Sequence, residues 1–306
     1  LAPKAQPAQR NHDRLLSAVE IVLGVLVAAG VVAGIWRLAT GLGSTTALTD
    51  SVPWGIWIGF DFSLIAFSGA AFTMAGLVYI LRREEFRPAL RPAVLTGLLG
   101  YMAVLVLLIL DLGRPDRFYH FIIFWNMHSP LFEICWCVLL YTTVLMIEVS
   151  PQILEKLNRV SWAHRVHQII VPVAIVAVTL SSLHQSTLGT LYLNMSHRLH
   201  PLWFTPILPV LFFISAVMVG LSMGAISYRV AARVTGGRAD DRVFTGLARA
   251  AGWVALLYLG LKVGDLALAG EMPALLAFDA ISWRMWAELA LVAIPLILLL
   301  APRLRQ

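Results

Sequence analysis

Long apolar runs separated by short polar segments make up most of this 306-residue chain. A helix needs about 20 apolar residues to cross the hydrocarbon core of a bilayer. Inside lipid such a run is stable as a helix because its backbone groups bond to one another. The pattern therefore predicts an all-α polytopic membrane protein with about eight transmembrane helices, over 15–39, 52–81, 94–110, 129–149, 166–184, 202–228, 244–269 and 275–301.

The composition supports this prediction. Hydrophobic residues make up 59% of the chain and charged residues only 13%, whereas about a quarter of a soluble domain is charged. The net charge of +6 would suggest nucleic-acid binding in a soluble protein. Here the basic residues lie mainly in loops, and the sequence has neither a basic domain nor zinc-ligand spacing, so we expect membrane lipid and no nucleic acid as a partner.

Lysine and arginine are distributed unequally between alternate loops, which predicts the orientation of the chain. Membrane proteins keep an excess of these residues on the cytoplasmic side. One set of loops holds Arg37, Arg114, Arg117, Arg198 and Lys262, while the other set holds Lys4, Arg10, Arg14, Arg82, Arg83, Arg87, Arg91, Lys156, Arg159, Arg165, Arg229, Arg233, Arg238, Arg242, Arg303 and Arg305. The rule places both ends in the cytoplasm and the first set of loops in the periplasm of a bacterial inner membrane.

A polar segment, 1–14, precedes the first apolar run. The run 15–39 is too long for a signal peptide and no small-residue cleavage site follows a short apolar core. We therefore expect a polar cytoplasmic tail followed by an N-terminal anchor helix.

Three ionisable residues, Asp61, Glu133 and His184, fall within predicted spans near their periplasmic ends. A charge inside the membrane costs a few kcal/mol or more, so such residues are candidates for function. We expect all three to line one pocket, with Asp61 about a turn deeper. Structural alternatives exist for each: Asp61 could pair with Arg114 or Arg117, Glu133 could pair with a nearby arginine, and His184 could cap the end of its helix.

The span that holds Glu133 also carries a stripe of protonatable side chains. Glu133, Cys137, Tyr141 and Glu148 are spaced so that they stay near one face of a helix. The two glutamates lie about 22 Å apart along the axis. This pattern predicts a proton relay through Tyr141 and Glu148; the alternative is that Glu148 faces lipid headgroups.

Protonatable side chains near the periplasmic ends of membrane spans are suited to protonating a quinone. Quinone reduction consumes two protons, the headgroup offers oxygens to hydrogen-bond donors, and the isoprenoid tail requires access from lipid. We expect Glu133 and His184 to be the catalytic, proton-donating residues. The full quinone site is then Trp54, Trp57, Asp61, Tyr101, Glu133 and His184. Tyr101, midway along the third span, could instead serve only packing, and Glu288 could form a structural ion pair with Arg249.

We expect no metal centre in this chain. Cys135 and Cys137 diverge on one helix and cannot alone hold a zinc ion or an iron–sulfur cluster. A dihaem cytochrome b is a rival interpretation that needs paired histidines on facing helices, for which His128 and His184 are the candidates. A transporter is a second rival, but its site would lie near the membrane midplane.

Five segments carry a family resemblance: PWGIWIGFDF, DLGRPDRFYH, SPLFEICWCVLLY, SSLHQSTLGTLY and HPLWFTPILP. In this order and spacing they resemble the NrfD/polysulphide-reductase family of integral membrane subunits, and within it the subunits of Hyb-type nickel–iron hydrogenases. The resemblance implies reaction with menaquinone or ubiquinone without haem. It also implies a periplasmic ferredoxin-like partner with [4Fe–4S] clusters, connected to a nickel–iron hydrogenase or a molybdopterin enzyme.

The resemblance further implies a fold based on four-helix bundles. Residues 52–189 would form the first bundle, with the quinone site near the periplasm, and 202–301 a second bundle one helix short of the family pattern. We expect a role in hydrogen oxidation, with a sulfur-metabolism or molybdopterin oxidoreductase complex as the alternative. The iron–sulfur partner would cover the loops 40–52, 111–128 and 185–201.

Overall fold

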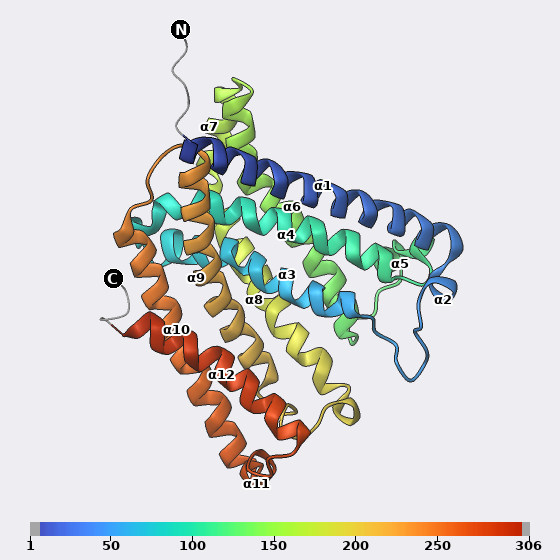
Figure 1. The fold of residues 1–306 in the computed structure, drawn as a ribbon. Helices are drawn as coiled ribbons and strands as arrows, with labels where there is room; N and C mark the ends of the chain where they lie inside the picture. Colours follow the sequence, from blue (N-terminus) through green and yellow to red (C-terminus); the bar gives the residue numbers. More distant parts are fainter. Residues whose placement is uncertain (1–6, 302–306) are drawn as a thin grey trace. The chain divides into compact units, whose positions relative to one another are not determined.

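The computed structural model describes residues 7–301, with side chains from Ala18 onward. Residues 7–301 contain helices and no β-strand (Figure 1), which confirms the predicted all-α class. The expected tail residues 1–6, together with Arg303 and Arg305, lie outside the described part. The α-helices are α1 (Pro7–Thr40), α2 (Leu42–Thr45), α3 (Ile56–Ala75), α4 (Arg87–Asp111), α5 (His120–Ile123), α6 (Pro130–Lys156), α7 (Val160–Gln168), α8 (Ile170–Leu193), α9 (Leu208–Val234), α10 (Asp241–Leu268), α11 (Met272–Leu275) and α12 (Ala280–Leu300).

Eight helical segments of the described chain are long and apolar enough to cross a membrane, which confirms the predicted number. They are Ala18–Thr40, Ile56–Ile80, Glu84–Asp111, Pro130–Lys156, Ile170–Leu193, Leu208–Val234, Asp241–Leu268 and Ala280–Leu300. The second of these ends in a π-helical turn, η1 (Gly76–Ile80), and the third begins with a 3₁₀ turn, η2 (Glu84–Phe86). The chain is therefore a multi-pass membrane protein.

Helix α1 begins at Pro7, so the second half of the expected polar tail is helical, while its membrane-crossing part, Ala18–Thr40, agrees with the predicted span 15–39. One predicted boundary is wrong, because helix α8 continues to Leu193, well past the predicted end at His184. The helix tolerates the polar residues after His184 because their hydroxyls are satisfied by carbonyls one turn earlier: Thr187 donates to Leu183 and Thr190 to Ser186.

The chain divides into two compact units, which are described separately. The first comprises residues 1–58 and 106–118. In it, the buried Arg37 side chain of α1 donates to the Leu112 carbonyl at the end of α4. Trp57 donates its indole N–H to the Asp111 carboxylate. These bonds tie the end of α1 and the entrance to α3 to the end of α4.

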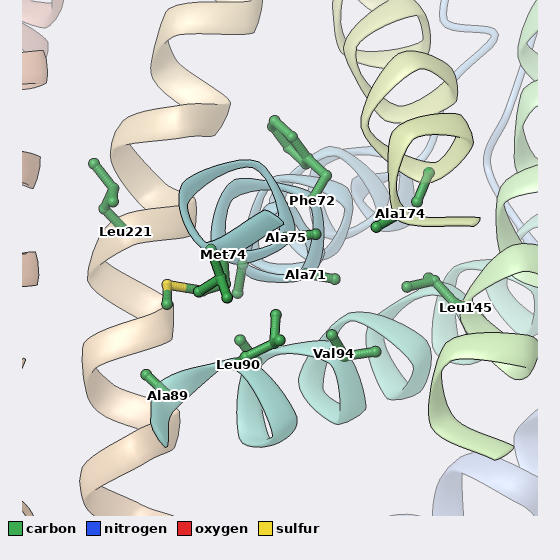
Figure 2. Packing of buried hydrophobic residues seen from close by; sticks show 14 of the residues in the cluster. Ala71, Phe72, Met74, Ala75, Ala89, Leu90, Val94, Leu145, Ala174 and Leu221 are labelled. Carbon is green, nitrogen blue, oxygen red and sulfur yellow. The ribbon is translucent and has the colours of Figure 1, made fainter. Parts of the chain in front are cut away.

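The second unit comprises residues 59–105 and 119–306. In it α9 packs against both α8 and α10, and α12 packs against α10 (Figure 1). Its main core is rich in small residues (Figure 2), among them Ala71 and Ala75 of α3, Ala89 of α4 and Ala174 of α8. Small side chains let helices approach closely in lipid, where dispersion contacts rather than water exclusion hold them together.

Helices α3 and α9 come closest at two glycines. A Cβ added at Gly220 would lie 2.5 Å from the Thr73 hydroxyl oxygen and 2.6 Å from the Gly69 carbonyl oxygen. A side chain at this position would therefore push the two backbones apart. The contact fixes α3, the helix that carries Asp61, against α9.

Candidate functional site

A cluster of buried polar side chains lies where α4, α6 and α8 meet in the second unit. Tyr101 of α4, Tyr141 of α6, and Ser181 and His184 of α8 are all fully buried. The Tyr101 ring centroid lies 4.8 Å from that of Tyr141 and 5.8 Å from that of His184. Both tyrosine hydroxyls lie near the Ser181 side chain. We call these four residues the tyrosine–histidine cluster.

The polar atoms of this cluster do not bond to one another in the usual way. Within residues 18–301, the two tyrosine hydroxyls, the Ser181 hydroxyl and both His184 ring nitrogens have no hydrogen-bond partner of normal geometry. Each such buried group costs about 1–3 kcal/mol, and native proteins contain few of them. Four neighbouring side chains of this kind are not accounted for by packing, and all of them can carry or pass a proton.

Glu133 lies beside this cluster, in the first turn of α6, and is half-buried. Its Oε1 atom accepts a hydrogen bond from the Thr187 hydroxyl at 2.8 Å. That hydroxyl is also 2.8 Å from the Leu183 carbonyl, and its single proton can serve only one acceptor at a time. A protonated Glu133 can therefore donate to Thr187 while Thr187 donates to Leu183. The predicted alternative of an arginine partner is not observed among the side chains that the structure describes.

Thr187 connects Glu133 to the cluster, because it lies one turn from His184 on α8. His184 is in the interior of α8, so the prediction that it ends or caps its helix is wrong. The Glu133 carboxyl group therefore contacts α8 about one helical turn from His184. Glu133 is the more accessible of the two, because it is half-buried whereas His184 is fully buried next to Tyr101.

The remaining predicted quinone-site residues divide between the two units. Asp61 of α3 belongs to the second unit and is 2% exposed. Trp54, just before α3, and Trp57, in its first turn, belong to the first unit. The Trp57 N–H is already bonded to Asp111. Trp57 can therefore offer a ligand its ring but no hydrogen bond.

Glu148 lies at the other end of α6, two turns beyond Tyr141. It is buried rather than exposed to headgroups, and its Oε2 atom has no hydrogen-bond partner in the described part of the chain. It lines a cavity of about 840 Å³ together with Tyr79, Arg82 and His167. Two helical turns correspond to about 10 Å, so this cavity ends a short distance from the tyrosine–histidine cluster.

A second cavity, of about 350 Å³, lies among α8, α9, α10 and α12. Glu288, in its wall, accepts hydrogen bonds from the Trp203 indole at 2.7 Å and the Tyr258 hydroxyl at 3.3 Å. The expected ion pair of Glu288 with Arg249 is thus wrong, since the Arg249 side chain is exposed. Lys262, which was counted with the charges of the periplasmic loops although it falls within the predicted span 244–269, is buried inside α10. A lysine within the apolar run LYLGLKVGDLAL was the signal that sequence analysis missed.

The two cysteines, Cys135 and Cys137, are free thiols. Within residues 18–301, no three histidine, cysteine, aspartate or glutamate side chains come together as metal ligands. The predicted absence of haem and iron–sulfur clusters from this chain stays a prediction.

Comparison with known proteins agrees with the sequence motifs. The family model described as "Polysulphide reductase, NrfD" matches residues 44–306. A protein of Nitratidesulfovibrio vulgaris is 35% identical over 299 residues, covering 95% of this chain and 76% of that protein. The "Probable Ni/Fe-hydrogenase 2 b-type cytochrome subunit" of Escherichia coli is 28% identical, covering 97% and 79%. The "Menaquinone reductase, integral membrane subunit" of N. vulgaris is 31% identical, covering 90% and 71%.

Proposed function

Because this chain belongs to the polysulphide reductase NrfD family, as its motifs predicted, we propose that it is the quinone-reactive membrane subunit of a respiratory redox complex. Two similar proteins support this proposal, since one is named for a nickel–iron hydrogenase and the other for menaquinone reductase. Electrons would come from the iron–sulfur clusters of a partner subunit. Hydrogen oxidation is the process we favour, and a sulfur or molybdopterin complex is the alternative.

The observation that carries the proposal is the tyrosine–histidine cluster beside Glu133. A quinone headgroup needs hydrogen-bond donors for its two oxygens. Tyr101, Tyr141 and His184 are donors that the surrounding protein leaves without normal partners, so their chemistry suits such a ligand. All three are fully buried and line neither of the two cavities described above, so a headgroup would reach them only from the side of the half-buried Glu133. When bound, a quinone supplies two-electron, two-proton redox chemistry.

Each residue then has a proposed role. Glu133 would give its proton to a ring oxygen, and Thr187 would hold the carboxyl group in place through the 2.8 Å hydrogen bond. His184 would return a proton to Glu133 from the tyrosine–histidine cluster. Asp61 would orient the site, and the expected contribution of Trp54 and Trp57, which belong to the first unit, stays a prediction.

Protons would reach the cluster from the opposite membrane face. Glu148 lines the cavity of about 840 Å³ and lies two turns from Tyr141 on α6. A proton taken up by Glu148 would pass through Tyr141 to the cluster. The arginine-rich loops around this cavity support a cytoplasmic location for it.

The same rule leads us to propose that both ends of the chain are cytoplasmic in a bacterial inner membrane. The ferredoxin-like [4Fe–4S] partner would then bind the periplasmic loops 40–52, 111–128 and 194–201. Residues 185–193 are removed from the predicted partner surface because they belong to α8. The division into a first bundle over 52–189 and a second over 202–301 stays a prediction.

The test is a comparison of Glu133→Gln with Glu20→Gln, a matched change at an exposed position of α1. Glutamine can keep the Thr187 hydrogen bond but cannot titrate. We expect quinone-linked turnover to fall about 100-fold or more in Glu133→Gln, within the range that a positioned acid or base contributes. Reduction of an artificial acceptor by the partner enzyme should persist. Normal quinone turnover in Glu133→Gln would refute the role of Glu133 as a proton donor.

A further inference from the structure

A buried lysine faces the cavity of about 350 Å³ in the second unit. Lys262 is 3% exposed and lies within a membrane span. Its ammonium donates to the Leu202 carbonyl at 3.2 Å, which uses one of its three N–H donors. A charge inside the membrane costs a few kcal/mol or more and marks a functional site by default.

The carboxylates near Lys262 are bonded to other side chains. Glu288 and Asp265 both lie close enough to attract the ammonium. Glu288, however, accepts from Trp203 and Tyr258, and Asp265 accepts from Thr205 at 2.7 Å. The remaining donors of Lys262 are therefore available to a molecule in the cavity.

Aromatic rings form much of the rest of the wall. Tyr192, Trp203, Phe212 and Tyr258 all line the cavity, and the ring centroids of Tyr192 and Phe212 are 5.8 Å apart. The volume lies at the lower end of the range of about 300–1,000 Å³ found for small-molecule sites. This combination suits one flat, compact ring system rather than the body of a phospholipid.

The charges in the cavity wall restrict the class of ligand further. The two charged residues in the wall, Lys262 and Glu288, have opposite sign, so the site favours a neutral ligand over a phosphate or a metal cation. Lys262 can donate to an oxygen at the ring edge, and Glu288 can accept from a ring hydroxyl. A ring that carries carbonyl oxygens when oxidised and hydroxyls when reduced satisfies both residues.

We propose that this cavity is a second quinone or quinol site, separate from Glu133 and His184, with Lys262 and Glu288 as its polar contacts. The choice of ligand rests on the proposed function. The cavity also adjoins α3, because Phe62, next to Asp61, packs on Tyr192 at 5.8 Å and on Phe212 at 6.4 Å between ring centroids. The Phe62 ring of α3 therefore packs against two rings of the cavity wall.

The test uses the complete purified complex and an azido-substituted naphthoquinone with a short isoprenoid tail. Photolabelled peptides are mapped by mass spectrometry. We expect label on the segment that contains Trp203 and Phe212. Lys262→Met, which removes the donor, should lower that label about tenfold or more, as expected for loss of a hydrogen bond to a charged group. Arg249→Met, an exposed cation on the same helix, is the matched control and should leave the label unchanged.

A second variant covers the case in which Lys262→Met does not fold. Ser215→Phe fills the cavity from α9, where the Ser215 hydroxyl bonds only within its own helix, to the Phe212 carbonyl. It should also abolish the label. Unlabelled Trp203 and Phe212 peptides in the wild type, or label that survives both variants, would overturn the proposal. So would a tightly held anionic phospholipid, seen by native mass spectrometry in place of quinone and lost in Lys262→Met.

The two sites can be judged separately. Label near Glu133 but not in the cavity refutes the second site alone. Label in the cavity with normal quinone turnover in Glu133→Gln refutes the catalytic role of Glu133 and supports the second site.

Discussion

Replacing Tyr141 by phenylalanine separates proton transfer from packing. The ring is fully buried and lies edge-to-face against Tyr101, a contact that phenylalanine keeps. The hydroxyl has no hydrogen-bond partner of normal geometry in the described part of the chain. Loss of a bonded hydroxyl usually destabilises a protein by about 1 kcal/mol, but an unsatisfied one already costs about 1–3 kcal/mol. We therefore expect Tyr141→Phe to be as stable as the wild type or more stable.

Activity should change in the opposite direction. Phenylalanine cannot pass a proton from Glu148 to the tyrosine–histidine cluster. A positioned acid–base group contributes about 10²- to 10⁴-fold to a proton-transfer step. Quinone-linked turnover should therefore fall about 100-fold, whereas the partner enzyme should reduce an artificial acceptor at the normal rate.

The assay follows thermal unfolding of the purified complex and both activities in parallel. Tyr228→Phe is the control, because the Tyr228 hydroxyl accepts a hydrogen bond from the Asp240 backbone N–H at 2.9 Å. This variant should lose stability and keep its turnover. If Tyr141→Phe behaves like the control, with lower stability and intact turnover, the hydroxyl serves structure and the relay is refuted.

Two further variants test the entry of protons at Glu148 and the packing of α3 against α9. Glu148→Gln should slow quinone-linked proton uptake from the side of the arginine-rich loops, measured with a pH dye in proteoliposomes, and uptake at the wild-type rate would exclude this entry. Gly220→Ala should lower the unfolding temperature, because its Cβ would lie 2.6 Å from the Gly69 carbonyl oxygen and overpacking costs about 1–3 kcal/mol. Gly260→Ala is its control, because nothing lies within 4 Å of the added carbon, and this change should leave the unfolding temperature unchanged or raise it. Equal effects of the two changes would show that α3 and α9 do not need the close contact.

Hydropathy was sufficient to predict the eight spans, because crossing lipid requires long apolar runs whatever the tertiary contacts. It failed where polar residues lie inside a helix. His184 and the segment after it looked like the end of a span, yet the hydroxyls of Thr187 and Thr190 bond within α8. Lys262 was counted with the loop charges because it is a lysine, although it lies within the predicted span 244–269 and is buried in α10.

The site was only partly predictable. Glu133, Asp61 and His184 could be selected from the cost of intramembrane charge. Their contacts depend on how each helix is rotated about its axis, which the sequence of one helix does not determine. Tyr101 was therefore ambiguous until its ring was seen between Tyr141 and His184. The bonds of Glu288 to Trp203 and Tyr258 join residues far apart in the chain and had no local signal.

The most direct test of the central claim is an experimental structure of the purified membrane complex with quinone bound. We expect the headgroup to place an oxygen within about 3 Å of Glu133 or His184, the distance required for proton transfer, with the iron–sulfur partner on the same side of the membrane. A headgroup bound far from both residues, or an iron–sulfur partner on the side of the arginine-rich loops, would contradict it.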